Sequence, residues 1–155
     1  MSALSALASI ILLMRMNRRL KEDTSRADML QAVLEGVAFA IRDSFEVARS
    51  LGLDIPRSKI CGGGSASPLW RKIIANVLNI PLDMMTTEQG PSYGGAMLAM
   101  VGCGEYASVQ DCADALTAVS RTVEPDPAIA ARYEIQYRKF QQIYPAMRAL
   151  FQEIK

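Results

Sequence analysis

The chain has 155 residues, half of them hydrophobic and 21% charged, so it is long and apolar enough to fold around a sizeable core. Its formal net charge of +1 argues against nucleic-acid binding, which usually requires a concentrated basic surplus. The sequence contains no histidine, and its cysteines (Cys61, Cys103 and Cys112) lack CxxC spacing. These features argue against a Cys/His zinc site, a serine–histidine or cysteine–histidine catalytic pair and a disulfide framework. We therefore expect a cytoplasmic protein whose cysteines are small buried hydrophobic residues.

An apolar run, SALSALASIILLM, occupies residues 2–14 and is followed by a cluster of basic residues. The run is shorter than the roughly 20 residues that span a membrane. A signal peptide would carry its positive charge before the apolar stretch and not after it. We expect a helix that packs on its own domain or a neighbouring one, with attachment to a membrane surface as the less favoured alternative.

The stretch over residues 23–54 has apolar residues at intervals of three and four, which predicts a long helix. These apolar residues are Met29, Leu30, Val33, Leu34, Val37, Ile41, Phe45 and Ala48. Ser25 with Asp28 has the pattern of a capping box, and Gly52 is placed to end the helix. We interpret Arg42 and its charged neighbours as a solvated or paired helix face.

Short strands and helices alternate along the rest of the chain. The pattern predicts, in order, a strand at 58–61, a helix from 67, a strand at 80–86, a helix at 90–104, a helix at 108–119, a loop or brief strand at 121–127, and one long helix or two meeting at Pro145 over 128–154. Strands separated by helices indicate an α/β lobe with a small sheet. Because two strands are too few to stand alone comfortably, we expect partner strands upstream of this chain. Ala96 and Ala99 should form a narrow interface between their helix and the sheet.

Three consecutive glycines, Gly62, Gly63 and Gly64, lie between the first predicted strand and the helix that Ser67 and Pro68 open. Backbone N–H groups at such a turn, backed by a helix N-terminus, attract anions and allow a ligand to approach closely. The pattern is neither a Walker loop nor GxGxxG. From spacing alone, a nucleotide or phosphate site and a purely structural tight turn remain equally favoured.

Three linked segments identify a family resemblance: SRADMLQAVLEGVAFAIRDS, KICGGGSASPLWRKIIANVLNIPL and EQGPSYGGAMLAMVGCG. In this order and at these distances they resemble the C-terminal lobe of the FGGY carbohydrate kinases, most closely those that phosphorylate xylulose. The resemblance covers roughly residues 24–155, whereas residues 1–23 do not resemble the family. It implies an actin-like (ribonuclease H-like) ATPase fold of the α/β class, helix-rich with a small sheet, in which nucleotide lies between two lobes.

The resemblance also implies a nucleotide site on the glycine loop. Gly63 and Gly64 would pass beneath ATP or ADP, Gly62 would serve the turn, and Ser67 would offer a hydroxyl to the nucleotide. Trp70 is expected to anchor the core and not to stack on adenine. The reaction of the family transfers the γ-phosphoryl group of ATP to a sugar hydroxyl with the help of Mg²⁺.

The resemblance leaves most of the kinase machinery outside this chain. The sugar site and the catalytic aspartate belong to the N-terminal lobe, so no catalytic or metal-binding residue is assigned here, and the chain alone should be inactive. The alternative is a non-catalytic remnant or interaction module with the same fold. Apolar surface left exposed without the other lobe predicts self-association.

Overall fold

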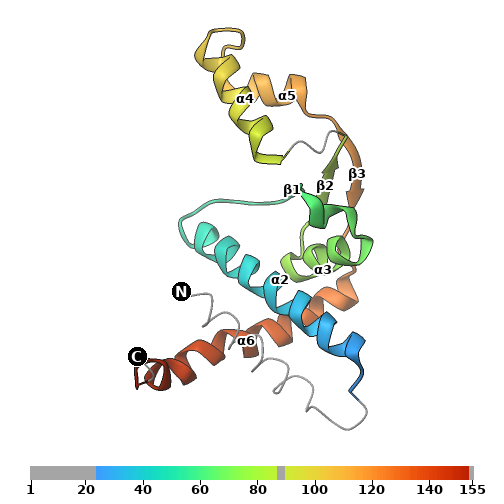
Figure 1. The fold of residues 1–155 in the computed structure, drawn as a ribbon, viewed down its shortest axis with the longest axis vertical. Helices are drawn as coiled ribbons and strands as arrows, with labels where there is room; N and C mark the ends of the chain where they lie inside the picture. The colour runs from blue at the N-terminus through green and yellow to red at the C-terminus, as the bar shows by residue number, and fades with distance from the viewer. Residues whose placement is uncertain (1–23, 87–89, 154–155) are drawn as a thin grey trace. The chain divides into compact units, whose positions relative to one another are not determined.

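The computed structural model describes residues 24–86 and 90–153 (Figure 1). The helix expected in residues 2–14 lies outside these ranges. In the described chain, no helix is long and apolar enough to cross a membrane.

The described residues divide into two compact units. The helical unit comprises residues 24–54, 76–79 and 125–153. The sheet unit comprises residues 55–75 and 80–124, without 87–89.

Helix α2, Arg26–Ser50, begins with the predicted capping box. The Ser25 hydroxyl accepts a hydrogen bond from the Asp28 N–H at 3.2 Å, and the Asp28 carboxylate accepts one from the Ser25 N–H at 3.1 Å. Gly52 follows the C-terminal end with a φ of +86°, a conformation that favours glycine. Both predicted ends of this helix are therefore confirmed.

The core of the helical unit is aromatic. Phe39 of α2 is fully buried, and its ring centroid lies 6.0, 5.9 and 5.5 Å from those of Tyr133, Tyr137 and Phe140. These three residues belong to α6, Pro127–Glu153. The expected apolar face of α2 is partly wrong, since the following residues of it are exposed: Met29, Leu30, Val33 and Val37. Apolar residues occupy more than one face of α2, so their spacing could not show that α6 covers the face of Phe39.

Arg42 is buried and paired at the same interface between α2 and α6, so the paired alternative for this charge is the correct one. Its guanidinium donates to the carbonyl oxygen of Val77 at 3.1 Å and to the Glu134 carboxylate. It also pairs with Glu46 at 3.3 Å and lies 4.1 Å from the centroid of the Tyr137 ring. These partners satisfy a charge that would otherwise be costly to bury.

Helix α6 continues through Pro145 as one helix. Of the two alternatives predicted for residues 128–154, one long helix is therefore correct and two helices meeting at Pro145 is wrong. Its start is tied to the end of α3, Pro68–Leu78, because the buried Asn76 side chain accepts a hydrogen bond from the Asp126 N–H at 2.7 Å. The Asp126 carboxylate in turn accepts from the N–H of Ala128 at 2.9 Å, which caps α6.

The sheet unit is built on three strands in the order β1-β2-β3. Strand β1, Ser58–Ile60, pairs in parallel with β2, Leu82–Met85. Strand β3, Val119–Val123, pairs antiparallel with β2. The expectation of only two clear strands was thus incomplete, and the helix predicted at 108–119 ran too far. β-branched residues at 117, 119, 122 and 123 favour a strand here.

Three helices accompany the strands. Helix α3, Pro68–Leu78, connects β1 to β2 and has proline at its first position, as predicted. Helices α4, Gly90–Gly102, and α5, Val109–Leu116, pack against each other between β2 and β3 in the chain (Figure 1). The Ser108 hydroxyl caps α5 by accepting from the Asp111 N–H at 3.1 Å.

Two expectations for this unit fail. Ala96 and Ala99 of α4 are exposed and do not form the predicted interface with the sheet within the described chain. Among the cysteines, Cys112 is buried as expected, but Cys61 and Cys103 are exposed. Cys61 directly follows the three-residue strand β1 and begins a turn, where its side chain does not reach the core.

Candidate functional site

The glycine loop leaves the sheet directly after β1. Gly62 has a φ of +87°, in the left-handed region where a side chain is strained. A short 3₁₀ helix, Gly63–Ala66, follows, and the Ser65 N–H donates to the Gly62 carbonyl oxygen at 2.9 Å. Gly62 therefore serves the geometry of the turn, as expected from the sequence.

Gly63 and Gly64 differ in their surroundings, although both are exposed. A Cβ added at Gly63 would meet no atom of the described residues within 4 Å. A Cβ added at Gly64 would lie 3.2 Å from two ring atoms of Trp70, which is tight. The backbone at Gly63 is thus open to an external ligand, whereas Gly64 also allows the half-buried Trp70 to approach.

The end of the loop is fixed by side chains of the following segment. The Ser67 hydroxyl accepts from the Trp70 N–H at 3.3 Å, which caps α3. The Arg71 guanidinium donates to the carbonyl oxygen of the buried Ser65 at 2.9 Å. A hydroxyl that accepts through its oxygen still has a proton to donate, so Ser67 can cap the helix and bind a ligand oxygen at once.

Replacing Gly62 by alanine should lower the free energy of unfolding by about 1–2 kcal/mol, the cost of a left-handed backbone in an L residue. Gly63→Ala is the matched control and should change it by less than about 0.5 kcal/mol, because its side chain meets no described neighbour. Urea unfolding followed by circular dichroism measures both. Equal effects of the two substitutions would contradict the assignment of the turn to Gly62.

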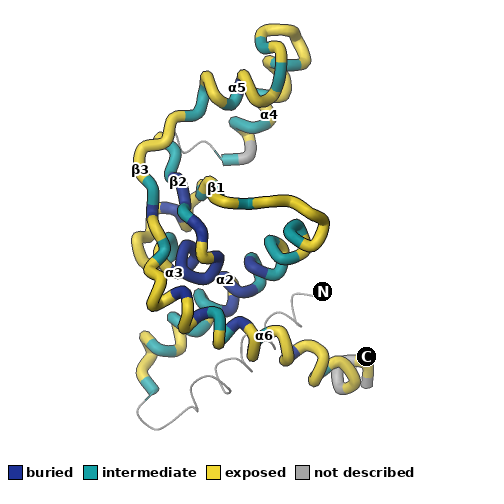
Figure 2. The backbone as a smooth tube through the Cα atoms, turned by 180° about the vertical axis from the view of Figure 1, so that it is seen from behind, coloured by how far each residue is buried: buried dark blue, intermediate teal, exposed yellow. Residues whose placement is uncertain are grey.

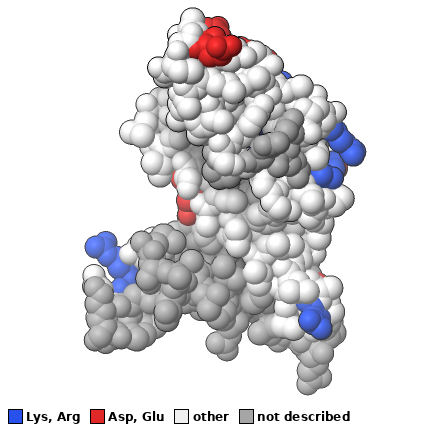
Figure 3. All heavy atoms as spheres, turned by 45° about the horizontal axis from the view of Figure 1, so that its top comes forward, with Lys and Arg blue, Asp and Glu red and all other residues white. Residues whose placement is uncertain are grey.

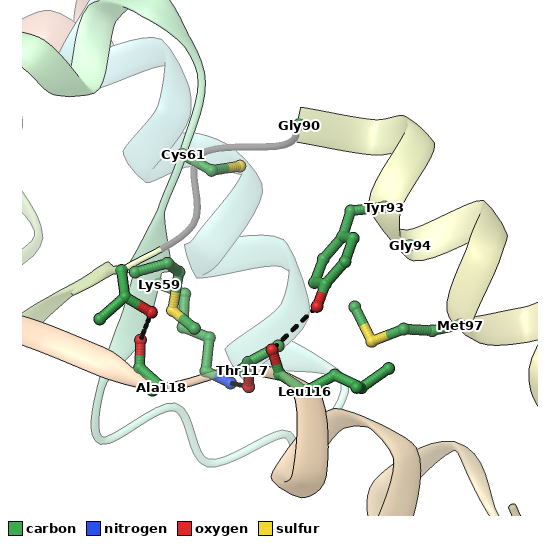
Figure 4. Close-up of a pocket in the computed structure, with 11 residues that line it drawn as sticks. Lys59, Cys61, Gly90, Tyr93, Gly94, Met97, Leu116, Thr117 and Ala118 are labelled. Atoms are coloured by element: carbon green, nitrogen blue, oxygen red, sulfur yellow. Dashed lines mark hydrogen bonds between the residues drawn. The ribbon is translucent and has the colours of Figure 1, made fainter.

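A pocket of about 200 Å³ lies beside the start of the glycine loop, within the sheet unit. Its wall includes Cys61 from the end of β1 and Gly90 and Gly94 from α4 (Figure 4). Apolar side chains dominate the rest of the wall, among them Met97 and Leu116.

The polar groups of this pocket are mostly engaged with the protein itself. The Lys59 ammonium donates to the Thr117 hydroxyl at 3.2 Å. The Tyr93 hydroxyl donates to the Leu116 carbonyl oxygen at 2.9 Å. Figure 4 shows the Lys59 ammonium and the Tyr93 hydroxyl turned toward the same end of the pocket. None of the described residues that line this pocket carries a carboxylate, and the described chain contains no cluster of His, Cys, Asp and Glu that could hold a metal ion. The described lining of the pocket is therefore mostly apolar, and its titratable side chains are Lys59, Cys61 and Tyr93.

The sequence predicted the glycine loop, but it predicted neither the contact of this loop with Trp70 nor the pocket beside it. The contact between Gly64 and Trp70 joins residues six apart, across a turn whose shape the sequence did not reveal. The pocket depends on Lys59, Tyr93 and Thr117, which come from three separate segments. Lys59 alone carried a signal in the sequence, because it is the charged residue of the predicted strand at 58–61.

Residues 6–103 match the C-terminal domain of the FGGY family of carbohydrate kinases. The chain belongs to this family. The match extends over the glycine loop and α4, and it begins inside residues 1–23. Its fold is accordingly part of an actin-like ATPase domain, helix-rich with a small sheet, as the sequence predicted.

Individual FGGY kinases show the same relationship. The xylulose kinase of Staphylococcus epidermidis is 30% identical over 126 residues, covering 81% of this chain and 25% of that protein. The L-xylulose/3-keto-L-gulonate kinase of Escherichia coli is 28% identical, covering 84% of this chain and 26% of that protein. The crystal structure of the xylulose kinase from Rhodospirillum rubrum is 30% identical with a TM-score of 0.74, covering 87% of this chain and 28% of that structure. This chain thus spans about a quarter of the length of these relatives.

Proposed function

We propose that this chain supplies the nucleotide-side portion of an ATP-dependent sugar kinase that acts in the cytoplasm. The observation that carries the proposal is the open glycine backbone at Gly63, placed between β1 and the N-terminal end of α3. Backbone N–H groups and a helix N-terminus together favour a phosphate-bearing ligand. Membership of the carbohydrate kinases makes ATP or ADP the expected nucleotide.

In this proposal each residue of the loop has a distinct part. Gly63 and Gly64 lie beneath the nucleotide, Gly62 shapes the turn, and Ser67 donates its hydroxyl proton to a nucleotide oxygen. Magnesium supplies charge neutralisation of the phosphates, and the described residues do not provide a set of ligands for it. The boundary at residues 23/24, with the nucleotide-binding portion over 24–155, also remains part of this proposal.

The proposed substrate is D-xylulose, which the kinase would convert to xylulose 5-phosphate in xylose metabolism. Support comes from the xylulose kinases of Staphylococcus epidermidis and Rhodospirillum rubrum. The γ-phosphoryl group would pass from ATP to the sugar hydroxyl, whose proton goes to a base outside this chain. No residue of this chain is assigned as that base, so the chain alone should bind nucleotide without transferring phosphate.

Calorimetric titration with magnesium-ADP tests the proposal. The wild-type chain should bind, and Gly63→Val should weaken binding at least about tenfold, or about 1.4 kcal/mol, because the side chain enters the space of the ligand. Gly95→Val is the matched control, since Gly95 is likewise exposed with no described atom within 4 Å of an added Cβ.

Equal affinity of wild type and Gly63→Val would place the nucleotide elsewhere. Absence of binding, both in the folded chain and when the chain is joined to the rest of a kinase, would favour the non-catalytic interaction module. Circular dichroism of each variant separates lost binding from lost structure.

A further inference from the structure

Helix α2 carries a second apolar face besides the one that packs against α6. Four apolar residues recur on it at intervals of three, four and three, within an arc of about 80° on a helix that turns 100° per residue. The name "α2 seam" is used below for these residues, which are Leu30, Val33, Val37 and Ala40. The first three are 57%, 37% and 38% exposed, and Ala40 is half-buried. Residues 26–35 of α2 include none that is buried (Figure 2).

The α2 seam is uncharged along its whole length. Glu35 is the one charged residue between Leu30 and Ala40 in the sequence, and its carboxylate accepts a hydrogen bond from the Tyr133 hydroxyl of α6 at 3.0 Å. Ser44, the next position in the same spacing, is polar, so the apolar series ends after Ala40. Alternating intervals of three and four along an apolar stripe are the pattern by which one helix packs along another. The α2 seam therefore has the character of a helix–helix interface.

The apolar run at residues 2–14, which lies outside the described residues, has the same spacing. The matching residues are Leu4, Leu7, Ile11 and Met14. In a helix, Ser5 and Ser9 would lie on the side opposite to them, and the run contains no charged residue. Each of the two series extends over ten residue steps, or about 15 Å of helix. The intervals of three, four and three also read the same in either direction, so the two series match when the helices are antiparallel.

We propose that residues 2–14 form a helix that packs antiparallel on the α2 seam of the same chain. In this arrangement Met14 lies next to Leu30, and Leu7 lies next to Val37. Residues 15–24 connect the two helices, and ten residues extend up to roughly 33 Å, more than the 8–10 Å between the axes of packed helices. The four basic residues of this connection fall outside the apolar run and remain in water.

The α2 seam of a second copy and a lipid surface are the competing partners. The connection favours packing within one chain, because a short flexible link raises the effective concentration of the run to roughly the millimolar range. A lipid surface is less favoured, because the polar side of the run carries serine and not lysine or arginine. The described Lys and Arg side chains visible in Figure 3 form no broad basic patch in either unit that would attract anionic lipid.

Thiol labelling of the full 155-residue chain tests the proposal. The thiol introduced by Val37→Cys should react with a maleimide at least about tenfold more slowly than the thiol introduced by Ala131→Cys, which is exposed on α6. Peptide mass spectrometry resolves these positions from the exposed native cysteines. Leu30→Cys gives a second reading on the α2 seam if Val37→Cys alters the fold, which circular dichroism reports.

Charges placed in the run show whether the run causes the protection. Leu7→Asp combined with Ile11→Asp should remove the protection at position 37, because two carboxylates cannot be buried against an apolar seam without partners. Ser5→Asp combined with Ser9→Asp is the matched control. It adds the same charge to the opposite side of the run and should leave the protection within about twofold.

Three outcomes would overturn the proposal. The first is equal labelling at positions 37 and 131, or protection at position 37 that Leu7→Asp with Ile11→Asp leaves unchanged. The second is protection that disappears on dilution of the chain, which would assign the α2 seam to a second copy. The third is rapid labelling at position 37 in a chain that sediments with vesicles of phosphatidylcholine and phosphatidylserine, which would assign the run to a lipid surface. None of these readouts depends on nucleotide, so they are independent of the magnesium-ADP titration.

Discussion

Replacing Phe39 by alanine should lower the free energy of unfolding by about 3–5 kcal/mol, a large part of the 5–15 kcal/mol typical of a domain. Phe39 is fully buried and contacts the rings of Tyr133, Tyr137 and Phe140. The substitution removes the transfer free energy of the ring and leaves a cavity between two long helices that can close only in part. Urea unfolding followed by circular dichroism measures the loss.

The matched control for Phe39→Ala is Val47→Ala on the same helix. Val47 is 61% exposed, so its truncation should change stability by less than about 0.5 kcal/mol. A Phe39→Ala variant within 1 kcal/mol of wild type would contradict the aromatic core of the helical unit. Phe39→Leu should fall between the two, because leucine refills part of the space.

Local signals predicted the ends of elements well. The capping box of Ser25 and Asp28, the left-handed Gly52 and the proline that opens α3 are each decided by one or two neighbouring residues. Such features depend on backbone geometry and hydrogen bonds within one turn, so the sequence carries them directly. The glycine loop was predicted for the same reason.

Long-range features were predicted poorly. Phe39 did not belong to the expected apolar face of α2, because only the position of α6 decides which face of that helix is covered. The sequence predicts only a loop or brief strand where β3 lies, because the pairing of β3 with β2 joins residues about 40 positions apart. The Gly64–Trp70 contact likewise needed the shape of the turn. In each case the feature depends on a contact with a segment that the local sequence pattern does not include.

The three glycines of the candidate site are required for different physical reasons. Gly62 is required by a positive φ and Gly64 by the approach of Trp70, both within the fold. Only Gly63 lacks a reason inside the described chain, which makes it the residue whose substitution tests ligand binding most directly. Consecutive glycines thus need not share one role. Substitutions of Gly62 or Gly64 would change the stability of the fold, so a loss of ligand binding in those variants could not be assigned to the site.

Replacing Arg42 by methionine should lower the free energy of unfolding by about 2–3 kcal/mol. Methionine keeps most of the side-chain length but removes the donors to the Val77 carbonyl and the Glu134 carboxylate. Removing one partner of a fully buried ion pair costs about 3–5 kcal/mol. The Glu134 and Glu46 side chains are 39% and 37% exposed, so water can replace part of what Arg42 gave them. Urea unfolding measures the loss at neutral pH.

The pH dependence of stability separates the charge of Arg42 from its packing. Burial raises the pKa of Glu134, but the hydrogen bonds and charges of Arg42 and Arg138 outweigh it and hold that pKa below its ordinary value of 4.5. A lowered pKa in the folded state adds stability above pH 4.5, and this stability is lost as the pH falls through the folded value. Arg42→Met should therefore weaken the fall in stability on acidification from about pH 5.5 to 3.

Arg138→Met is the control for both measurements, because Arg138 also pairs with Glu134, at 2.8 Å, but its side chain is 68% exposed. An exposed pair contributes at most about 1 kcal/mol, so this variant should lose less than half of what Arg42→Met loses. Equal losses in the two variants would mean that the Glu134 charge alone matters, and that the Val77 carbonyl and the Tyr137 ring contribute nothing. A large loss for Arg42→Met with an unchanged acid dependence would instead assign the role of Arg42 to packing against that ring.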